Sequence, residues 1–227
     1  MGRSLRANGT LDIAGRPAAW LREGALDGRP VVALAHGAGA ALDSAFLEDA
    51  ARDLVDGGVC VVRFHFPYMQ QRVDTGSRRP PDRSPVLLDC WRALLDRIAG
   101  MRGAGPVVMA GKSMGARMAS MLLAEGRAPE VRGAVYFGYP LHPSGKPERL
   151  RSEHLPDVPV PQLFVTGTRD ALAELRLLRR ALKPVEGARL LVVEGGDHSL
   201  ARRKKDEVLG PAVDWMAGSL AFIHEVC

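Results

Sequence analysis

Short apolar runs alternate with longer amphipathic stretches from residue 31 almost to the end of the chain. Each apolar run is bounded by glycine, proline or polar residues, which is typical of buried strands. Such strands are predicted at 31–35, 59–66, 107–110, 131–137, 161–167 and 189–194. The amphipathic stretches predict helices at 42–55, 85–99, 171–183 and about 203–223, and another that begins near Gly111–Gly115 and reaches about Glu125.

The remaining segments lack a clear period. Residues 1–29 are mixed and rich in turns, so one or two edge strands are expected there. Residues 67–83, rich in Arg, Pro and Asp, predict a polar loop. Residues 138–160 predict a small lid that is mostly loop, with a short helical piece near 147–154.

Alternation of continuous apolar strands with helices predicts the α/β class, with a mostly parallel twisted sheet covered by helices on both faces. Right-handed crossovers bring the loops that follow the strands to one edge of such a sheet, where chemistry is expected. The 227 residues are 46% hydrophobic, and no linker divides them. We therefore expect a single domain over residues 1–227.

Charge and aromatic content argue against a nucleic-acid partner. The net charge is +5, but carboxylates are interspersed among the arginines. The densest basic run, 202–205, is followed at once by Asp206 and Glu207, which favours the solvated start of a helix. Aromatic residues make up only 5% of the chain, too few for an evident base-stacking platform.

The cysteines and the N-terminus bear on location. Cys60 lies in an apolar strand and Cys90 on an apolar helix face, so both are expected in the core. The odd count and the absence of zinc spacing argue against disulfides and a metal site. The N-terminus has no apolar signal core, and no apolar run reaches the ~20 residues of a membrane span. A cytoplasmic protein that does not bind membranes is predicted.

The most informative motif is Gly111-Lys112-Ser113-Met114-Gly115. It follows an apolar strand and precedes a helical pattern, the order that a nucleophile elbow requires. The glycines leave space where side chains would collide, and the turn between them exposes the Ser113 hydroxyl. A glycine-rich turn with an ordinary surface serine is the alternative interpretation.

A serine nucleophile needs a base and an acid that orients the base. His198 follows the strand at 189–194 and is the candidate base, while Asp170 follows the strand at 161–167 and is the candidate acid. Two rival acids remain open. Asp197 adjoins the histidine, and Glu194 ends its strand.

The loop His36-Gly37-Ala38-Gly39 follows the strand at 31–35, where hydrolases place one oxyanion donor. The expected donors are the backbone N–H groups of Ala38 and Met114. His36 is expected to hydrogen-bond the backbone beneath this loop rather than transfer protons. The other residues expected to shape the pocket or its entrance are Gly37, Tyr68, Lys112, Tyr139 and His142.

These motifs together resemble the α/β-hydrolase superfamily, with dienelactone-hydrolase-like members closest in size. The stretches at 63–68 and 139–148 narrow the likeness. They resemble the hydrolase-like domain of the third regulatory subunit of the nonspecific-lethal histone acetyltransferase complex, and its testis-expressed relative. The resemblance implies the α/β-hydrolase fold with an eight-stranded core, a minimal lid, no cofactor, and Ser113, Asp170 and His198 as the triad.

The sequence thus favours a serine hydrolase, such as a carboxylesterase, that cleaves a small ester, thioester or similar acyl compound through an acyl-enzyme. The expected partner is the small-molecule acyl substrate. The sequence also leaves open a homodimer or a protein partner. One alternative is a non-catalytic scaffold subunit that keeps the fold. Another is an acyltransferase that uses the same triad.

Overall fold

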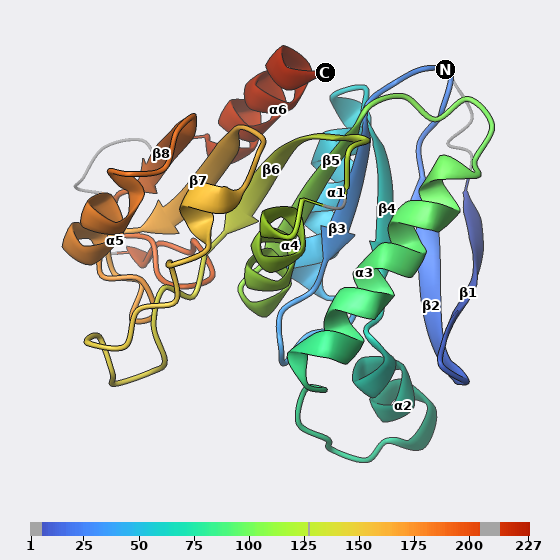
Figure 1. Cartoon of the computed structure of the whole chain (residues 1–227), viewed down its shortest axis with the longest axis horizontal. Helices are drawn as coiled ribbons and strands as arrows, with labels where there is room; N and C mark the ends of the chain where they lie inside the picture. The colour runs from blue at the N-terminus through green and yellow to red at the C-terminus, as the bar shows by residue number, and fades with distance from the viewer. Residues whose placement is uncertain (1–5, 127, 205–213) are drawn as a thin grey trace.

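A computed structural model describes residues 6–126, 128–204 and 214–227 (Figure 1). One sheet of eight strands runs through it in the order β1-β2-β4-β3-β5-β6-β7-β8. The strands are β1 (Ala7–Ile13), β2 (Arg16–Glu23), β3 (Val31–Ala35), β4 (Cys60–Phe64), β5 (Val107–Lys112), β6 (Val131–Phe137), β7 (Gln162–Gly167) and β8 (Ala188–Val193).

The sheet is mostly parallel, which confirms the predicted fold class. The pairs β1–β2 and β2–β4 are antiparallel, and the other five pairs are parallel. Of the one or two edge strands expected among residues 1–29, β1 lies at the edge of the sheet, whereas β2 lies between β1 and β4. The carboxyl ends of the parallel strands point toward the lower edge of Figure 1.

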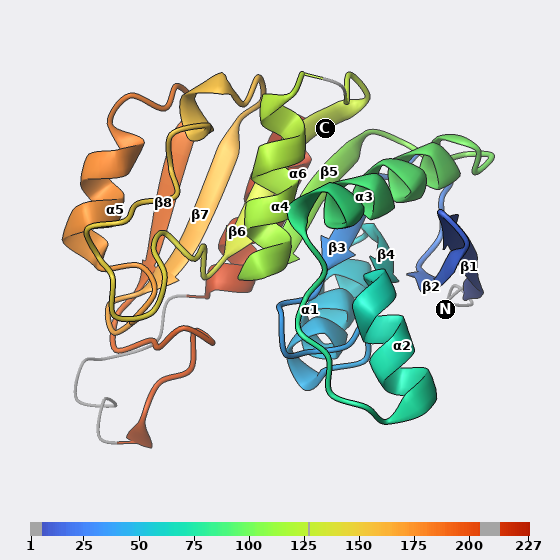
Figure 2. The same cartoon turned by 60° about the horizontal axis from the view of Figure 1, so that its bottom comes forward.

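Helices cover both faces of the sheet (Figures 1 and 2). They are α1 (Ala45–Asp56), α2 (Pro67–Thr75), α3 (Ser84–Ala99), α4 (Met114–Ala124), α5 (Leu175–Leu182) and α6 (Trp215–Val226), with a 3-10 turn at Leu155–Asp157. The helices α1 and α6 pack on one face, and α2 to α5 on the other.

The two-residue period of the strands sorts their side chains between these layers. On β3, Val31, Ala33 and Ala35 belong to the core beneath α3 and α4. Val32 and Leu34, from the same strand, belong to the core beneath α1 and α6. A strand buried on both faces must be apolar at every position, which explains the continuous runs in the sequence.

Three predicted segments differ from the structure. The expected polar loop at 67–83 contains α2, because Pro67 suits the first helical turn and Tyr68 and Met69 are buried against the sheet. The expected helical piece near 147–154 is replaced by the 3-10 turn at Leu155–Asp157.

The last helix begins at Trp215 rather than near residue 203. At its start, the Asp214 side chain accepts a hydrogen bond from the Ala217 N–H. The part of the predicted helix at 205–213 lies outside the described residues.

Among the described residues, no helix is long and apolar enough to cross a bilayer. Cys60 and Cys90 are buried and free, as the sequence predicts, and Cys227 is exposed.

Candidate active site

Ser113 lies on the sharp turn between β5 and α4, with φ 51° and ψ −114°. This is a strained backbone conformation for a residue other than glycine. The two flanking glycines permit it. A Cβ on Gly111 would lie 2.5 Å from the Ala116 nitrogen, and a Cβ on Gly115 would lie 2.7 Å from the His36 carbonyl oxygen. Neither contact is tolerable, so glycine at position 111 lets α4 approach β5, and glycine at position 115 lets α4 approach the end of β3.

Three side chains from distant segments meet above this turn. The Nε2 atom of His198 lies 2.9 Å from the Ser113 hydroxyl oxygen. On the other side of the ring, Nδ1 lies 2.9 Å from each carboxylate oxygen of Asp170. The Asp170 side chain is fully buried, and it also accepts a hydrogen bond from the Leu172 N–H at 2.8 Å. The carboxylate is therefore held in place beneath the ring.

The two rival acids point elsewhere. One carboxylate oxygen of Asp197 accepts the N–H groups of Ser199 and Ala201, at 2.8 and 3.1 Å, so this side chain stabilises its own turn. Glu194 accepts a hydrogen bond from the Thr168 hydroxyl at 3.2 Å in an exposed position. Of the three candidate carboxylates, Asp170 is the one in hydrogen-bond contact with the imidazole.

The loop after β3 is held by a buried imidazole. Burial lowers the pKa of His36 to about 3, so the ring is neutral and carries one N–H. Its Nε2 accepts the Phe66 N–H at 3.1 Å, which leaves Nδ1 to donate to the Gly37 carbonyl at 2.7 Å. In a trans peptide the carbonyl and the next N–H point in opposite directions. His36 therefore fixes the direction of the Ala38 N–H.

A second hydrogen bond holds the other side of Ala38. The Tyr68 hydroxyl donates to the Ala38 carbonyl at 2.9 Å. Ala38 lines the same cavity as Ser113 and Met114. The Met114 N–H belongs to the first turn of α4, where no partner inside the helix exists. Both residues whose N–H groups are expected to bind an oxyanion therefore line the cavity next to the serine.

Lys112 connects the elbow to the histidine loop. Its ammonium group donates to the His198 backbone carbonyl at 2.5 Å. Gly138 leaves room for this contact, because a Cβ there would lie 2.8 Å from the lysine Nζ. Burial lowers the pKa of Lys112 to about 8, and the nearby Asp170 carboxylate opposes that shift.

A cavity of about 330 Å³ opens beside Ser113. Its wall includes two arginines that the sequence analysis did not single out, Arg117 and Arg151. Arg117 could have been found from its position four residues after the serine on a helix, which places both on one face. Arg151 lies in the loop at 138–160, and no periodic pattern fixes the path of that loop.

Most residues expected to shape the pocket lie behind this wall instead. His36, Tyr68, Lys112 and Tyr139 are buried, and none is among the residues that line the cavity. The Tyr139 hydroxyl donates to the Arg151 carbonyl at 2.7 Å, so this tyrosine supports the loop.

Two further expected pocket residues lie near the triad without lining the cavity. His142 borders a neighbouring hollow that Asp170 also lines. Gly37 packs against the elbow, and a Cβ on it would lie 3.5 Å from the Ser113 Cβ. Most of the expected pocket residues, namely His36, Tyr68, Lys112 and Tyr139, form hydrogen bonds with the backbone instead of lining the cavity.

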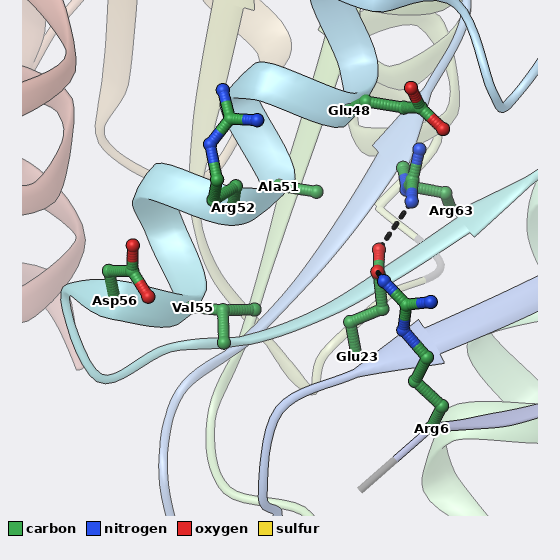
Figure 3. Close-up of a pocket in the computed structure, with 8 residues that line it drawn as sticks. All are labelled: Arg6, Glu23, Glu48, Ala51, Arg52, Val55, Asp56 and Arg63. Carbon is green, nitrogen blue, oxygen red and sulfur yellow. Dashed lines mark hydrogen bonds and ion pairs between the residues drawn. The ribbon is translucent and has the colours of Figure 1, made fainter. Parts of the chain in front are cut away.

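A second cavity, also about 330 Å³, lies beside α1, β2 and β4 (Figure 3). Glu23 pairs there with Arg6 at 3.0 Å and with the buried Arg63. Of the residues that the structure describes, no serine, cysteine or histidine lines this cavity. Among the described residues, no group of three or more His, Cys, Asp or Glu side chains could hold a metal ion.

Comparison with known proteins agrees with this fold. Residues 28–213 match the alpha/beta hydrolase domain family. A dienelactone hydrolase from Anabaena variabilis superposes with a TM-score of 0.75 at 17% identity, over 99% of this chain and 97% of that one. Est1E from Butyrivibrio proteoclasticus gives 0.72 at 14% identity, over 96% and 98%. A cold-adapted esterase from an Arctic intertidal metagenomic library gives 0.71 at 19% identity, over 100% and 98%.

Proposed function

The chain belongs to the alpha/beta hydrolase domain family, and from that premise we propose that it is a serine hydrolase acting on a small ester, thioester or similar acyl compound. The hydrogen-bonded series from the Ser113 hydroxyl through His198 to Asp170, with each contact at 2.9 Å, carries this proposal. Structural neighbours described as an esterase and a dienelactone hydrolase support the same reaction class.

In the proposed reaction, Ser113 attacks the substrate carbonyl while His198 takes the hydroxyl proton through Nε2. Asp170 holds the ring with Nδ1 protonated and stabilises the imidazolium that forms. The N–H groups of Ala38 and Met114 bind the developing oxyanion. The protonated histidine then gives its proton to the departing alcohol or thiol, which leaves an acyl-serine.

Water completes the cycle. His198 takes a proton from a water molecule, whose oxygen attacks the acyl-serine carbonyl. Collapse of the second tetrahedral intermediate releases a carboxylic acid and returns the proton to Ser113. If an alcohol or amine replaced water at this step, the same groups would perform acyl transfer.

A fluorophosphonate probe tests the proposal directly. The wild-type protein is expected to react covalently at Ser113, and the Ser113→Ala variant is expected to stay unlabelled. Ser120→Ala is the matched control, because Ser120 lies on the same helix and contacts His154 at 2.8 Å instead of the triad. Equal labelling of the wild type and Ser113→Ala would falsify the assignment of the nucleophile.

The narrower resemblance, to the nonspecific-lethal complex subunit and its testis-expressed relative, stays a prediction, as does a homodimer or a protein partner. A scaffold subunit needs no nucleophile next to an aligned imidazole, so the hydrogen-bonded triad favours catalysis. A stoichiometric partner in a pull-down, combined with no turnover of p-nitrophenyl esters, would support the scaffold function instead.

A further inference from the structure

Two arginines share the cavity with Ser113, and the proposed reaction uses neither of them. Arg117 lies on α4, and Arg151 lies in the loop between β6 and β7. Both side chains are partly buried. A guanidinium group is costly to bury near another one, because the two charges repel each other in a medium of reduced dielectric constant. The pair therefore needs an explanation beyond packing.

No carboxylate among the described residues forms an ion pair with either arginine. The Nε atom of Arg117 is buried and has no hydrogen-bond partner. Burial lowers the pKa of Arg151, and the positive charge of Arg117 lowers it further. Buried donors are normally satisfied, so this one indicates a missing acceptor.

Asp82 also lines the cavity, but its carboxylate is already engaged. Its two oxygens accept hydrogen bonds from the Arg16 guanidinium at 2.9 and 3.1 Å. One of them also accepts the Tyr68 N–H at 3.0 Å. Asp82 therefore neutralises Arg16, and the positive charge of the other two arginines remains available in the cavity.

The position of Arg117 sets the scale of the site. It lies four residues after Ser113, so about 6 Å of helix axis separate the two residues on one face. Helical side chains lean toward the N-terminus, which for Arg117 is the direction of the serine. Much of the remaining cavity wall is apolar and includes Leu87, Met118 and Leu172, which suit a short carbon chain.

We propose that Arg117 and Arg151 form a subsite for a carboxylate carried by the substrate, a few bonds from the reacting carbonyl. The planar guanidinium group matches a carboxylate with two parallel hydrogen bonds. An anion between the two arginines also offsets their mutual repulsion. The inference rests on the proposed function, since it assigns a substrate class, the half-esters and half-thioesters of short dicarboxylic acids, to the same cavity.

Two matched esters test this subsite. One is the mono-4-nitrophenyl ester of adipic acid, and the other is the same molecule with its free carboxylate methylated. The wild type is expected to show a kcat/KM about ten- to a hundredfold higher for the anionic ester, the range that charged hydrogen bonds supply. Arg117→Gln and Arg151→Gln are each expected to remove most of this preference, chiefly through KM, and to change turnover of the methylated ester little.

Arg132→Gln is the control for the loss of one positive charge. Arg132 is exposed near the start of β6, at the opposite edge of the sheet from Ser113, and this variant is expected to keep the wild-type preference. Equal kcat/KM values for the two esters in the wild type would overturn the proposal. So would a preference that survives both arginine substitutions, or one that Arg132→Gln reduces equally.

A binding measurement separates this proposal from the proposed function. Adipate is expected to raise the unfolding temperature of the wild type and of Arg132→Gln, but to raise that of Arg117→Gln much less. If the fluorophosphonate probe fails to label Ser113 and neither ester is cleaved, the hydrolase assignment fails, and the adipate shift alone then decides the subsite. No adipate shift in the wild type would count against the subsite even if Ser113 proves to be the nucleophile.

Discussion

The Lys112 ammonium group donates a hydrogen bond to the backbone carbonyl of His198, the residue whose ring contacts Ser113. A residue of the elbow motif therefore holds the loop that carries the imidazole. The lysine is buried, and its Nζ lies 5.7 Å from the centre of the Phe46 ring. This contact joins the end of β5 to the loop after β8, which are separated by two strands in the sheet.

Replacing this lysine is expected to reduce activity without unfolding the protein. Lys112→Met keeps the apolar stem and removes the hydrogen bond, so the His198 loop loses one of its constraints. We expect kcat to fall about tenfold while KM changes little, because the substitution misplaces the base rather than the substrate. Steady-state kinetics with a p-nitrophenyl ester checks this. Lys146→Met, at an exposed position, is the control. An unchanged kcat for Lys112→Met would show that the contact does not position the base.

The same lysine gives the stability of the protein a defined dependence on pH. Its pKa of about 8 in the folded protein is below its unfolded value of 10.5, so the unfolded chain binds more protons between these values. Stability linked to Lys112 therefore rises with pH across this window, by up to about 3 kcal/mol. Urea titrations of the wild type and Lys112→Met at pH 7.5, 9 and 10 measure the difference. Parallel pH profiles of the two proteins would contradict the predicted shift.

The buried His36 ring makes the stability of the protein depend on pH on the acid side of neutrality. The pKa of the buried ring is about 3, below its unfolded value of 6.5. The stability contributed by the neutral ring is complete above pH 6.5 and is lost as the pH falls toward 3, at about 1.4 kcal/mol per unit. His36→Gln keeps an acceptor for the Phe66 N–H but removes the titration. We expect lower stability at pH 7 and a shallower acid limb than in the wild type, measured by urea unfolding from pH 7 to 4.

The identity of the acid can be tested with two conservative variants. Asp170→Asn leaves the shape of the site but removes the charge that orients the imidazole, so kcat is expected to fall roughly a hundredfold or more. Asp197→Asn keeps a carbonyl oxygen for the N–H groups of Ser199 and Ala201, and it is expected to change kcat less than about threefold. Kinetics on both variants decides the assignment, and a larger loss for Asp197→Asn would reverse it.

The sequence predicts the triad because each of its members follows a strand of a parallel sheet. Continuous apolar runs identify the strands, and their carboxyl ends meet at one edge whatever the exact helix boundaries are. The hydrophobic pattern does not predict a helix whose buried residues lack the helical period. The stretch 67–75 is mostly polar, and only Pro67, Tyr68 and Met69 are buried, so its helix was not predicted.

The cavity wall is the least predictable part of the site. Arg151 lies in a loop whose path depends on hydrogen bonds such as the one that the Tyr139 hydroxyl donates to the backbone carbonyl of Arg151. Such contacts join residues far apart in the chain and leave no period in the sequence. Conversely, Tyr68 and Lys112 have the residue types of pocket groups, but their polar atoms are used to hold backbone carbonyls.

The elbow glycines predict a sharp cost for the smallest possible substitution. Gly111→Ala would place a methyl group 2.5 Å from the Ala116 nitrogen and from the Gly115 carbonyl carbon, both backbone atoms that cannot rotate away. Strand β5 and helix α4 would have to separate, so we expect a loss of several kcal/mol of stability and of fluorophosphonate labelling. At Gly100, which closes α3 with φ −77°, an added Cβ has its nearest neighbour at 3.6 Å, an ordinary contact. Gly100→Ala is therefore expected to fold and label like the wild type, and urea unfolding together with probe labelling of both variants separates local crowding at the elbow from a general effect of alanine.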